Sequence, residues 1–425
     1  MMAATDVQSL VDVENGLMDR RVFSDPMLYE LEQERVFARC WLYLAHESQL
    51  PNPGDFVTTY MGEDPVLVVR GEDGKIRAFL NTCRHRGNRV CRLDEGTARN
   101  FTCTYHGWSY TNEGKLTGVP SYKEFWFEEL DKEQWGLVPV PHVDSYKGLV
   151  FGNLDPGAIG LREYLGDMAW CIDTFLDRSP GGTEVLAGAH RWTMDANWKT
   201  AAENFGGDAY HVALTHQSAF RSGFGGNAGS GRGLLYGGSG YQISPHAGHG
   251  MGCRIADSEE QLVSGDAVPV IQDYVHGSYP EVERRLGQTR ARFSMVHGTV
   301  FPNFSFLSAA STIRVWQPKG PLKFEVTAWC IVDKDAPPEV KDAYRLHYLR
   351  RFSPGGTLEQ DDSDNWIQVS QAGRGLAARR VPLNYKMGMG HEQAHDDIPG
   401  KLGPWESDNN QRSFYAHWAQ LMAKP

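Results

Sequence analysis

The sequence predicts an α+β protein of two domains, a small all-β domain and a larger domain that mixes helices with strands. Three observations support this prediction. The chain of 425 residues is too long for one compact unit. Short strand-like runs separated by tight turns extend from about residue 50 to residue 155. Beyond residue 155 the patterns are mixed, with both helical and strand-like segments. We expect the β domain at residues 39–155 and the second domain at residues 1–38 with 156–425.

The first segment is expected to be a helix, and the next to form hairpins. Asp25 is a suitable N-cap, and Pro26 suits the first helical position ahead of an apolar stripe in LYELEQERVFARCW. The runs PVLVVR (65–70) and IRAFL (76–80) flank Asp73-Gly74, a strong hairpin signal. A second turn is expected at residues 112–115, and residues 153–157 (NLDPG) end the β-rich stretch.

The second domain is predicted from the period of its apolar residues. Residues 161–176, 201–216 and 340–352 have helical patterns, and residues 299–306, 312–317 and 324–332 have strand patterns. Residues 222–252 hold 12 glycines in 31 positions, which is typical either of a surface loop or of a lid over a pocket. No internal repeat of solenoid length is present in the sequence.

Composition and charge exclude several classes of protein. A chain that is 41% hydrophobic, 22% charged and 11% aromatic is not mainly disordered. The net charge of −11 disfavours nucleic acid and anionic membranes as main partners. No apolar run reaches the roughly 18 residues that span a bilayer, and the N-terminus lacks a secretory pattern. Seven scattered cysteines fit reduced thiols better than a disulfide framework. We expect a cytoplasmic protein.

Two short motifs in the β domain combine thiols with imidazoles. CRHRG (83–87) supplies Cys83 and His85, and CTYHGW (103–108) supplies Cys103 and His106. Structural zinc sites usually pair Cys with Cys and His with His, whereas here each half supplies one of each. This division suits a [2Fe–2S] cluster with one iron on two thiolates and the other on two imidazoles. A structural zinc site, or four unrelated residues, is the alternative.

The middle of the chain offers a second metal site. Asp208 and His211 are three residues apart and would share one face of a helix. His211 and His216 are five residues apart, about 140° around a regular helix. Both histidines can therefore bind one metal only if the helix widens to a π-type turn or if His216 lies beyond its end. Two histidines with a distant carboxylate form the ligand set of non-haem Fe(II) oxygenases.

The carboxylate is expected from the acidic run EQDDSDNW at residues 359–366. By itself this run is more typical of a solvated helix N-terminus, where negative charge is favoured by the helix dipole. Together with the two histidines and the cluster motif, it indicates the third iron ligand.

The two motifs together resemble the large, catalytic subunit of Rieske ring-hydroxylating dioxygenases. The resemblance covers nearly the whole chain, and it is closest to the branch that acts on biphenyl, phenylpropionate and polycyclic hydrocarbons. The segments that carry it are MGEDPVLVVR, NTCRHRGNRVCR, the pattern N-F-x-x-D-x-x-H-x-x-x-x-H, SYKGLVFGN and EQDDSDNW. It implies an N-terminal all-β Rieske domain and a catalytic domain with a large antiparallel sheet flanked by helices.

The resemblance also implies roles for individual residues. Cys83, His85, Cys103 and His106 would hold the cluster, and His211, His216 and Asp362 would hold the mononuclear iron. Asp208 would be the catalytic carboxylate that bridges an iron histidine and a cluster histidine of a neighbouring subunit. The residues implied for the substrate pocket, on a looser match, are Asn204, Phe205, His297, Leu307 and Phe352.

Partners follow from the same resemblance. Within one chain of the family the two metal centres are too far apart for fast electron transfer, so a homotrimer is implied, as α3 or as α3β3 with a small β subunit. Electrons would come from NADH through a separate reductase and a ferredoxin. We see no dinucleotide-binding fingerprint in this chain. The implied reaction adds both atoms of O₂ to an aromatic ring and gives a cis-dihydrodiol.

Other functions remain as alternatives. An electron carrier would use the Rieske domain alone, but it would leave about 270 residues and the second metal site without a role. A zinc-stapled binding module is disfavoured in its nucleic-acid form by the negative charge. The nearer alternatives are a Rieske monooxygenase or demethylase, and a dioxygenase for an aromatic carboxylate.

The substrate is predicted from the residues expected around the pocket. Segments 204–220, 297–311 and 352–362 contain no Arg or Lys, and a buried carboxylate without a cation is costly. Arg221, Arg314 and Arg351 lie just outside these segments and could pair with a carboxylate, so an aromatic carboxylate is the alternative substrate. We expect an uncharged bicyclic or polycyclic hydrocarbon, bound mainly through apolar contacts.

Overall fold

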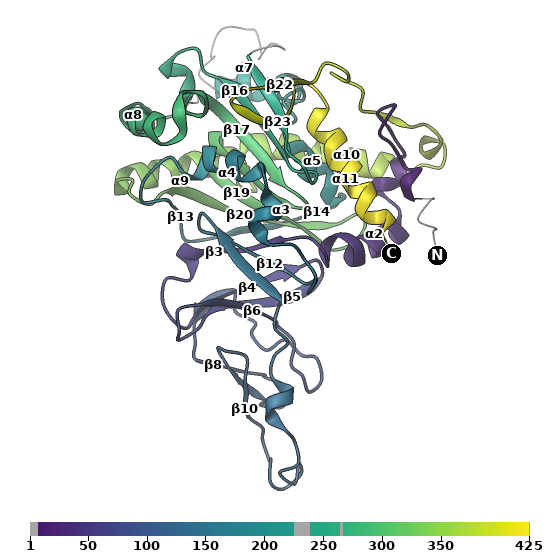
Figure 1. Ribbon diagram of the computed structural model, residues 1–425, viewed down its shortest axis with the longest axis vertical. Coiled ribbons are helices and arrows are strands. Elements are labelled where there is room, and N and C mark those ends of the chain that lie inside the picture. Colours follow the sequence, from purple (N-terminus) through teal and green to yellow (C-terminus); the bar gives the residue numbers. More distant parts are fainter. Residues whose placement is uncertain (1–6, 225–238, 264–266, 425) are drawn as a thin grey trace. The chain divides into compact units, whose positions relative to one another are not determined.

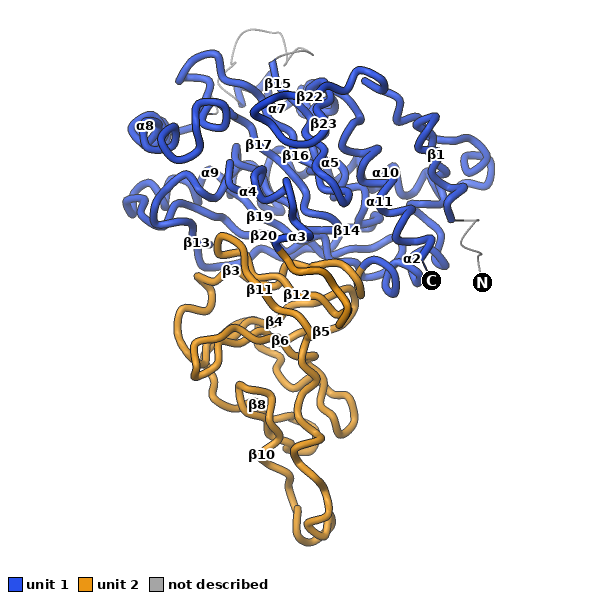
Figure 2. Tube along the Cα trace, viewed as in Figure 1, with its two compact units in different colours: residues 1–36, 162–425 blue, residues 37–161 orange. Residues whose placement is uncertain are grey.

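The computed structural model describes residues 7–224, 239–263 and 267–424 and divides into two units. One unit comprises residues 37–161, and the rest of the described chain forms the other (Figure 2). The predicted domain limits at residues 39 and 155 lie inside the first unit. The predicted α+β class is confirmed, because the first unit is built from strands and the second combines a large sheet with helices (Figure 1).

The unit of residues 37–161 consists of three small antiparallel sheets. The first has the order β6-β5-β4-β7, the second β10-β9-β8 and the third β11-β12-β3. The predicted hairpin is present as β5 and β6, joined through Asp73-Gly74. The strand bounds are β3 Leu42–His46, β4 Asp55–Met61, β5 Asp64–Arg70, β6 Ile76–Leu80, β7 Glu95–Thr97, β8 Asn100–Thr102, β9 Ser109–Thr111, β10 Leu116–Gly118, β11 His142–Tyr146 and β12 Leu149–Asn153.

The larger unit is organised around a ten-stranded antiparallel sheet. Its order is β13-β20-β19-β18-β17-β16-β15-β23-β22, with β14 also paired to β20. Side chains of the interior strand β19 are buried along its whole length, as expected of a strand covered on both faces. The bounds are β13 Thr183–Val185, β14 His190–Met194, β15 Gly240–Ser244, β16 Gly250–Ile255, β17 Phe293–Val300, β18 Phe304–Leu307, β19 Thr312–Pro318, β20 Phe324–Asp333, β22 Gln393–His395 and β23 Ile398–Pro404.

Helices pack against this sheet. Helix α5 contacts β17, β18 and β19, α11 contacts β15 and β16, and α9 contacts β20 (Figure 1). The helix bounds are α2 Pro26–Glu32, α3 Leu161–Leu165, α4 Met168–Leu176, α5 Trp198–Phe205, α6 Val212–Thr215, α7 Gln217–Arg221, α8 Pro269–Ala291, α9 Pro338–Phe352, α10 Thr357–Ala372 and α11 Asn409–Ala423. A three-stranded sheet of β1 Val11–Asp12, β2 Leu17–Met18 and β21 Leu383–Asn384 completes the unit. No helix among the described residues is long and apolar enough to cross a membrane.

A buried polar cluster fixes helix α5, which begins the candidate site. Lys199 Nζ lies 2.5 Å from Glu32 Oε1, and both side chains are about 1% exposed. The indole nitrogens of Trp198 and Trp418 donate to the same carboxylate at 2.9 and 2.8 Å. Glu32 thus joins α2, α5 and α11, and every polar atom of the cluster has a partner, as a buried charge requires.

Several expected elements differ from the structure. The strand expected at residues 299–306 is the end of β17 and most of β18, separated by a turn at residues 301–303. The helix expected at residues 161–176 is interrupted between α3 and α4, where Gly166 has φ +46°. The glycine-rich stretch lies partly outside the described residues, at 225–238, whereas its last part forms β15 and the start of β16.

Candidate metal centres and cavity

The prediction of one continuous helix over residues 201–216 is wrong. The chain is interrupted between α5 and α6, and this break positions the side chains of the site. Helix α5 starts at the Asn197 cap and ends at Phe205, ahead of Gly206 and Gly207. Gly207 has φ +134°, and a Cβ there would lie 2.3 Å from Asn410 Nδ2. Only glycine suits that backbone and that close approach. The chain then forms the single turn α6, and His216 lies beyond its end, which is one of the two arrangements expected.

Three side chains from two distant segments converge here. His211 Nε2 and His216 Nε2 lie 3.3 and 3.4 Å from Asp362 Oδ1. All three ligand atoms lie within 4.8 Å of one another. With metal–ligand bonds of about 2.1 Å and angles between about 90° and 110°, ligand atoms lie about 3.0–3.4 Å apart. The spacing therefore suits one metal ion held by two imidazoles and a carboxylate.

The surroundings of these atoms also suit a cation. Asp362 is 3% exposed, and its Oδ1 has no hydrogen-bond partner of suitable geometry among the described residues. An ionised carboxylate buried in this way is costly unless a cation lies beside it. Burial lowers the pKa of His211, but Asp208 and Asp362 outweigh it and raise that pKa to about 10. The site is thus strongly negative, and a divalent cation would be favoured in it.

Two further carboxylates orient the imidazoles. Asp208 Oδ2 lies 3.2 Å from His211 Nδ1, and Asp361 Oδ2 lies 3.3 Å from His216 Nδ1. The side chain of Asn204 donates to Asp208 at 3.4 Å. Each ring is therefore held at Nδ1, which leaves its Nε2 turned towards Asp362. Carboxylates in this position fix the tautomer and raise the basicity of a metal-ligating histidine.

Helix α10 supplies Asp362, and the acidic run is not a solvated helix end. Glu359 and Asp362 are 1% and 3% exposed. With Trp366 and Ser370 they recur at three- and four-residue spacing, so they share one buried helix face. Asp361 lies on the neighbouring face, with its side chain 28% exposed.

The four residues of the cluster motif lie on two loops of the smaller unit that have the same backbone hydrogen bonds. The amide of Cys83 donates to Asn88, and that of Cys103 donates to Trp108, each at 2.8 Å. Each cysteine carbonyl then accepts from a glycine, Gly87 or Gly107, at 2.9 Å, and both glycines have positive φ. Two short sequences of similar pattern thus fold into two similar loops.

The donor atoms in these loops fall into two pairs. Both thiols are buried, and the pKa of Cys103, which burial raises, is lowered overall by hydrogen bonds that include one from Asn88. The imidazoles of His85 and His106 are only partly buried and lie 4.5 Å apart between ring centroids. His85 stacks on Trp108, and its Nδ1 has no partner within residues 7–224, 239–263 and 267–424. This arrangement fits a two-iron cluster with its imidazole side towards the surface.

A cavity of about 520 Å³ lies beside the three converging side chains in the larger unit. All five residues expected around the substrate line it, namely Asn204, Phe205, His297, Leu307 and Phe352. The neighbouring wall is apolar, with Phe205 and Phe352 edge to face at 6.1 Å and Phe175 stacked on Phe306 at 5.5 Å. Burial lowers the pKa of His297 to about 4, so this ring is neutral at pH 7.

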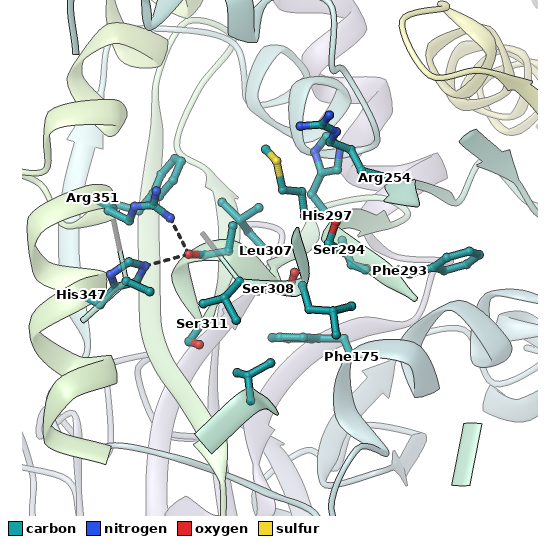
Figure 3. A pocket seen from close by; sticks show the side chains of 18 of the residues that line it. Phe175, Arg254, Phe293, Ser294, His297, Leu307, Ser308, Ser311, His347 and Arg351 are labelled. Carbon is teal, nitrogen blue, oxygen red and sulfur yellow. Dashed lines mark hydrogen bonds between the residues drawn. The ribbon is translucent and has the colours of Figure 1, made fainter. Parts of the chain in front are cut away.

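Among the residues that the structure describes, the cavity lining contains three arginines, although the segments expected to form it contain no Arg or Lys. Arg351 lines it, as do Arg178 and Arg254, which sequence reasoning missed because no motif surrounds them. Arg351 and His347 both lie near the carbonyl oxygen of Ala309, at 2.7 and 3.1 Å. Figure 3 shows these two residues at one side of the drawn lining and Arg254 with His297 at the other. Arg314 is not in the lining but forms an ion pair with Glu359.

Comparison with known proteins assigns each of the two units to a family. The family "Ring hydroxylating alpha subunit (catalytic domain)" matches residues 183–424, and the family "Rieske [2Fe-2S] domain" matches residues 40–146. The biphenyl dioxygenase alpha subunit of Paraburkholderia xenovorans (strain LB400) is 43% identical over 99% of this chain and 94% of its own length. The benzene 1,2-dioxygenase alpha subunit of Pseudomonas putida is also 43% identical, over 99% and 94%. A solved structure of naphthalene 1,2-dioxygenase with indole bound in its active site superposes with a TM-score of 0.93 at 36% identity, covering 100% of this chain and 95% of that one.

Proposed function

This chain belongs to the ring-hydroxylating dioxygenases as a large, catalytic subunit, and from that premise we propose its substrate and the residues that act on it. The general reaction of the family adds O₂ to an aromatic ring and gives a cis-dihydrodiol. The protein is an oxygenase component with a Rieske [2Fe–2S] cluster and a non-haem iron. Its own substrate is an uncharged aromatic hydrocarbon of two or three rings.

The residues that bind the iron are His211, His216 and Asp362. This assignment is supported mainly by one observation, the convergence of their ligand atoms beside the cavity. When bound, the iron supplies the centre at which dioxygen is reduced with electrons from the cluster, which Cys83, His85, Cys103 and His106 bind. Asp208 and Asp361 hold the two imidazoles in place throughout.

The size of the cavity supports a substrate of more than one ring. A cavity of about 150 Å³ lined by aliphatic and aromatic side chains is enough for benzene. The volume here is about 520 Å³. Phe205, Phe352, Leu307 and Leu358 would contact a flat apolar ring on the side of the iron ligands. Excluding water from this wall would supply most of the binding energy, at about 25 cal/mol per Å².

The partners are those of a multicomponent system. The biphenyl and benzene dioxygenase relatives are named as alpha subunits, and a naphthalene 1,2-dioxygenase relative as a large oxygenase component, so we infer that this chain acts with other proteins. We infer a ferredoxin and a reductase as the electron source, a small β subunit, and a trimer of this chain. A trimer would let Asp208 of one subunit bond to a cluster histidine of the next.

Turnover assays with ¹⁸O₂ test the proposal. The purified oxygenase, with a ferredoxin and an NADH-dependent reductase, is supplied with naphthalene, biphenyl, phenanthrene, benzoate and phthalate in parallel. We expect cis-dihydrodiols of the three hydrocarbons with both oxygen atoms labelled. Incorporation of one atom would instead indicate a monooxygenase. Turnover limited to the two acids would refute the hydrocarbon assignment and would point to Arg351, Arg178 or Arg254 as the carboxylate-binding residue.

A further inference from the structure

A buried arginine lies directly behind the iron ligand and the cavity wall. Arg314, on strand β19, is 0% exposed and its partner Glu359 is 1% exposed. Its Nη1 donates to Glu359 Oε2 at 2.6 Å, and its Nη2 donates to the carbonyl oxygen of Phe352 at 3.0 Å. The guanidinium lies over the rings of Phe205 and Trp316, at 4.8 and 5.3 Å from their centroids.

Stability alone does not explain this ion pair. Burying both charges costs more than an apolar pair of the same shape would, unless all their polar atoms are satisfied. Here Nε of Arg314 and Oε1 of Glu359 have no hydrogen-bond partner in the described part of the chain. The pair differs in this from the fully bonded Glu32–Lys199 pair. A geometric role is therefore the better explanation.

The two bonds of Arg314 span the junction between α9 and α10. Phe352 is the last residue of α9, and Glu359 lies in the first turn of α10. Ser353-Pro354-Gly355-Gly356 joins the two helices, and two glycines leave the backbone with many accessible conformations. A planar guanidinium that bonds on both sides of this junction fixes the start of α10 relative to β19.

The same contacts determine where two functional side chains lie. Glu359 and Asp362 are three residues apart on α10 and share its buried face. Phe352 lines the cavity. A shift of the first turn of α10 would therefore move the iron-binding carboxylate relative to the wall against which the substrate packs.

We propose that Arg314 is a positioning residue, which places Asp362 through Glu359 and the cavity wall through the Phe352 carbonyl. It touches neither the substrate nor the metal. The proposal rests on the assignment of Asp362 as an iron ligand. On this proposal, the alignment of the substrate ring with the iron depends on Arg314, a residue outside the cavity lining.

The test compares full-length oxygenase variants loaded with both metal centres. Arg314→Met/Glu359→Leu removes both charges at similar volume, and Arg314→Lys keeps the charge but loses the planar fork. Lys341→Met/Glu184→Gln is the matched control, because it removes the 2.8 Å ion pair at the other end of α9. For each variant we would measure the release of mononuclear iron to a chelator, with cluster absorbance as internal standard, and the ratio of diol regioisomers from phenanthrene.

We expect iron release at least tenfold faster and a changed regioisomer ratio in Arg314→Met/Glu359→Leu, a smaller change in Arg314→Lys, and neither change in the control. Wild-type iron release and product ratio in both Arg314 variants would overturn the proposal. If the double variant does not fold, Arg314→Lys and Glu359→Gln decide by the same measurements. Asp362→Ala separates the two hypotheses, because iron retained in that variant would refute the ligand assignment itself.

Discussion

Adjacent aspartates on α10 are expected to affect iron binding to very different extents. Asp362 Oδ1 lies near the Nε2 atoms of both histidines, whereas Asp361 contacts only Nδ1 of His216, at 3.3 Å. Alanine at either position leaves the helix backbone intact. Asp362→Ala removes one of the three proposed protein ligands and should abolish retention of mononuclear iron.

Asp361→Ala should weaken iron binding without abolishing it. The change removes the carboxylate that orients His216 but leaves all three ligand atoms in place. Loss of such an orienting contact typically costs 10- to 100-fold in metal affinity, or about 1.4–2.7 kcal/mol. The Asp361 side chain is 28% exposed, so water can replace part of the lost bond and the lower end of that range is expected.

The assay is iron content after desalting, followed by Fe(II) titration of the depleted protein. Cluster absorbance in the same samples is the control, because Cys83, His85, Cys103 and His106 lie in the other unit. We expect wild type to bind one iron in addition to those of the cluster. Asp361→Ala should bind this iron only at higher free Fe(II), and Asp362→Ala should not bind it. Loss of iron in Asp361→Ala with retention in Asp362→Ala would refute the assignment.

Two further predictions concern neighbouring carboxylates. Asp208→Asn should keep both metal centres loaded but reduce turnover at least tenfold, because the 3.2 Å contact to His211 Nδ1 loses its charge. If the same iron assay showed loss of mononuclear iron instead, Asp208 would be a ligand. Burial, with Asp208 and Asp408, raises the pKa of Glu203 from its usual 4.5 to about 8, against bonds from Tyr385 and Tyr415. A raised folded-state pKa stabilises the fold below pH 4.5, and that stabilisation is lost as the pH rises towards 8. The Tm of Glu203→Gln should therefore exceed that of wild type by an amount that grows up to about pH 8. The control Glu30→Gln, at an exposed position, should show no such trend. A Tm difference between Glu203→Gln and wild type that does not change with pH would contradict this prediction.

Residue types with strict chemical requirements were predictable from the sequence. Few side chains can hold a [2Fe–2S] cluster. Two Cys-His motifs close together in the sequence, at residues 83–87 and 103–108, therefore indicate such a cluster by themselves. The two histidines that we propose as iron ligands, His211 and His216, stood out in the sequence for the same reason, and the structure brings them together with Asp362. The helix expected across them was wrong because the apolar pattern of residues 201–205 outweighed Gly206-Gly207, although that glycine pair was a visible signal of the break.

Positions that depend on distant elements were not predictable. Arg178, Arg254 and Arg351 come from three separate segments, and only the folded chain brings them to one cavity. For α10, by contrast, a local signal existed: Leu358, Asp362 and Trp366 recur every four residues. That period favours a half-buried helix over a solvated one.

Four carboxylates in and around the proposed iron site illustrate why residue type alone could not assign their roles. Asp208 contacts His211, Asp361 contacts His216, Asp362 contacts both histidines through Nε2, and Glu359 contacts Arg314. All four are acids, and three lie within four consecutive positions, so the sequence offers little to distinguish them. The helix separates them by rotation, since about 100° between neighbours turns Asp361 away from the face that Glu359 and Asp362 share. The partner that each carboxylate meets then decides whether it binds metal, orients a ligand or anchors the helix.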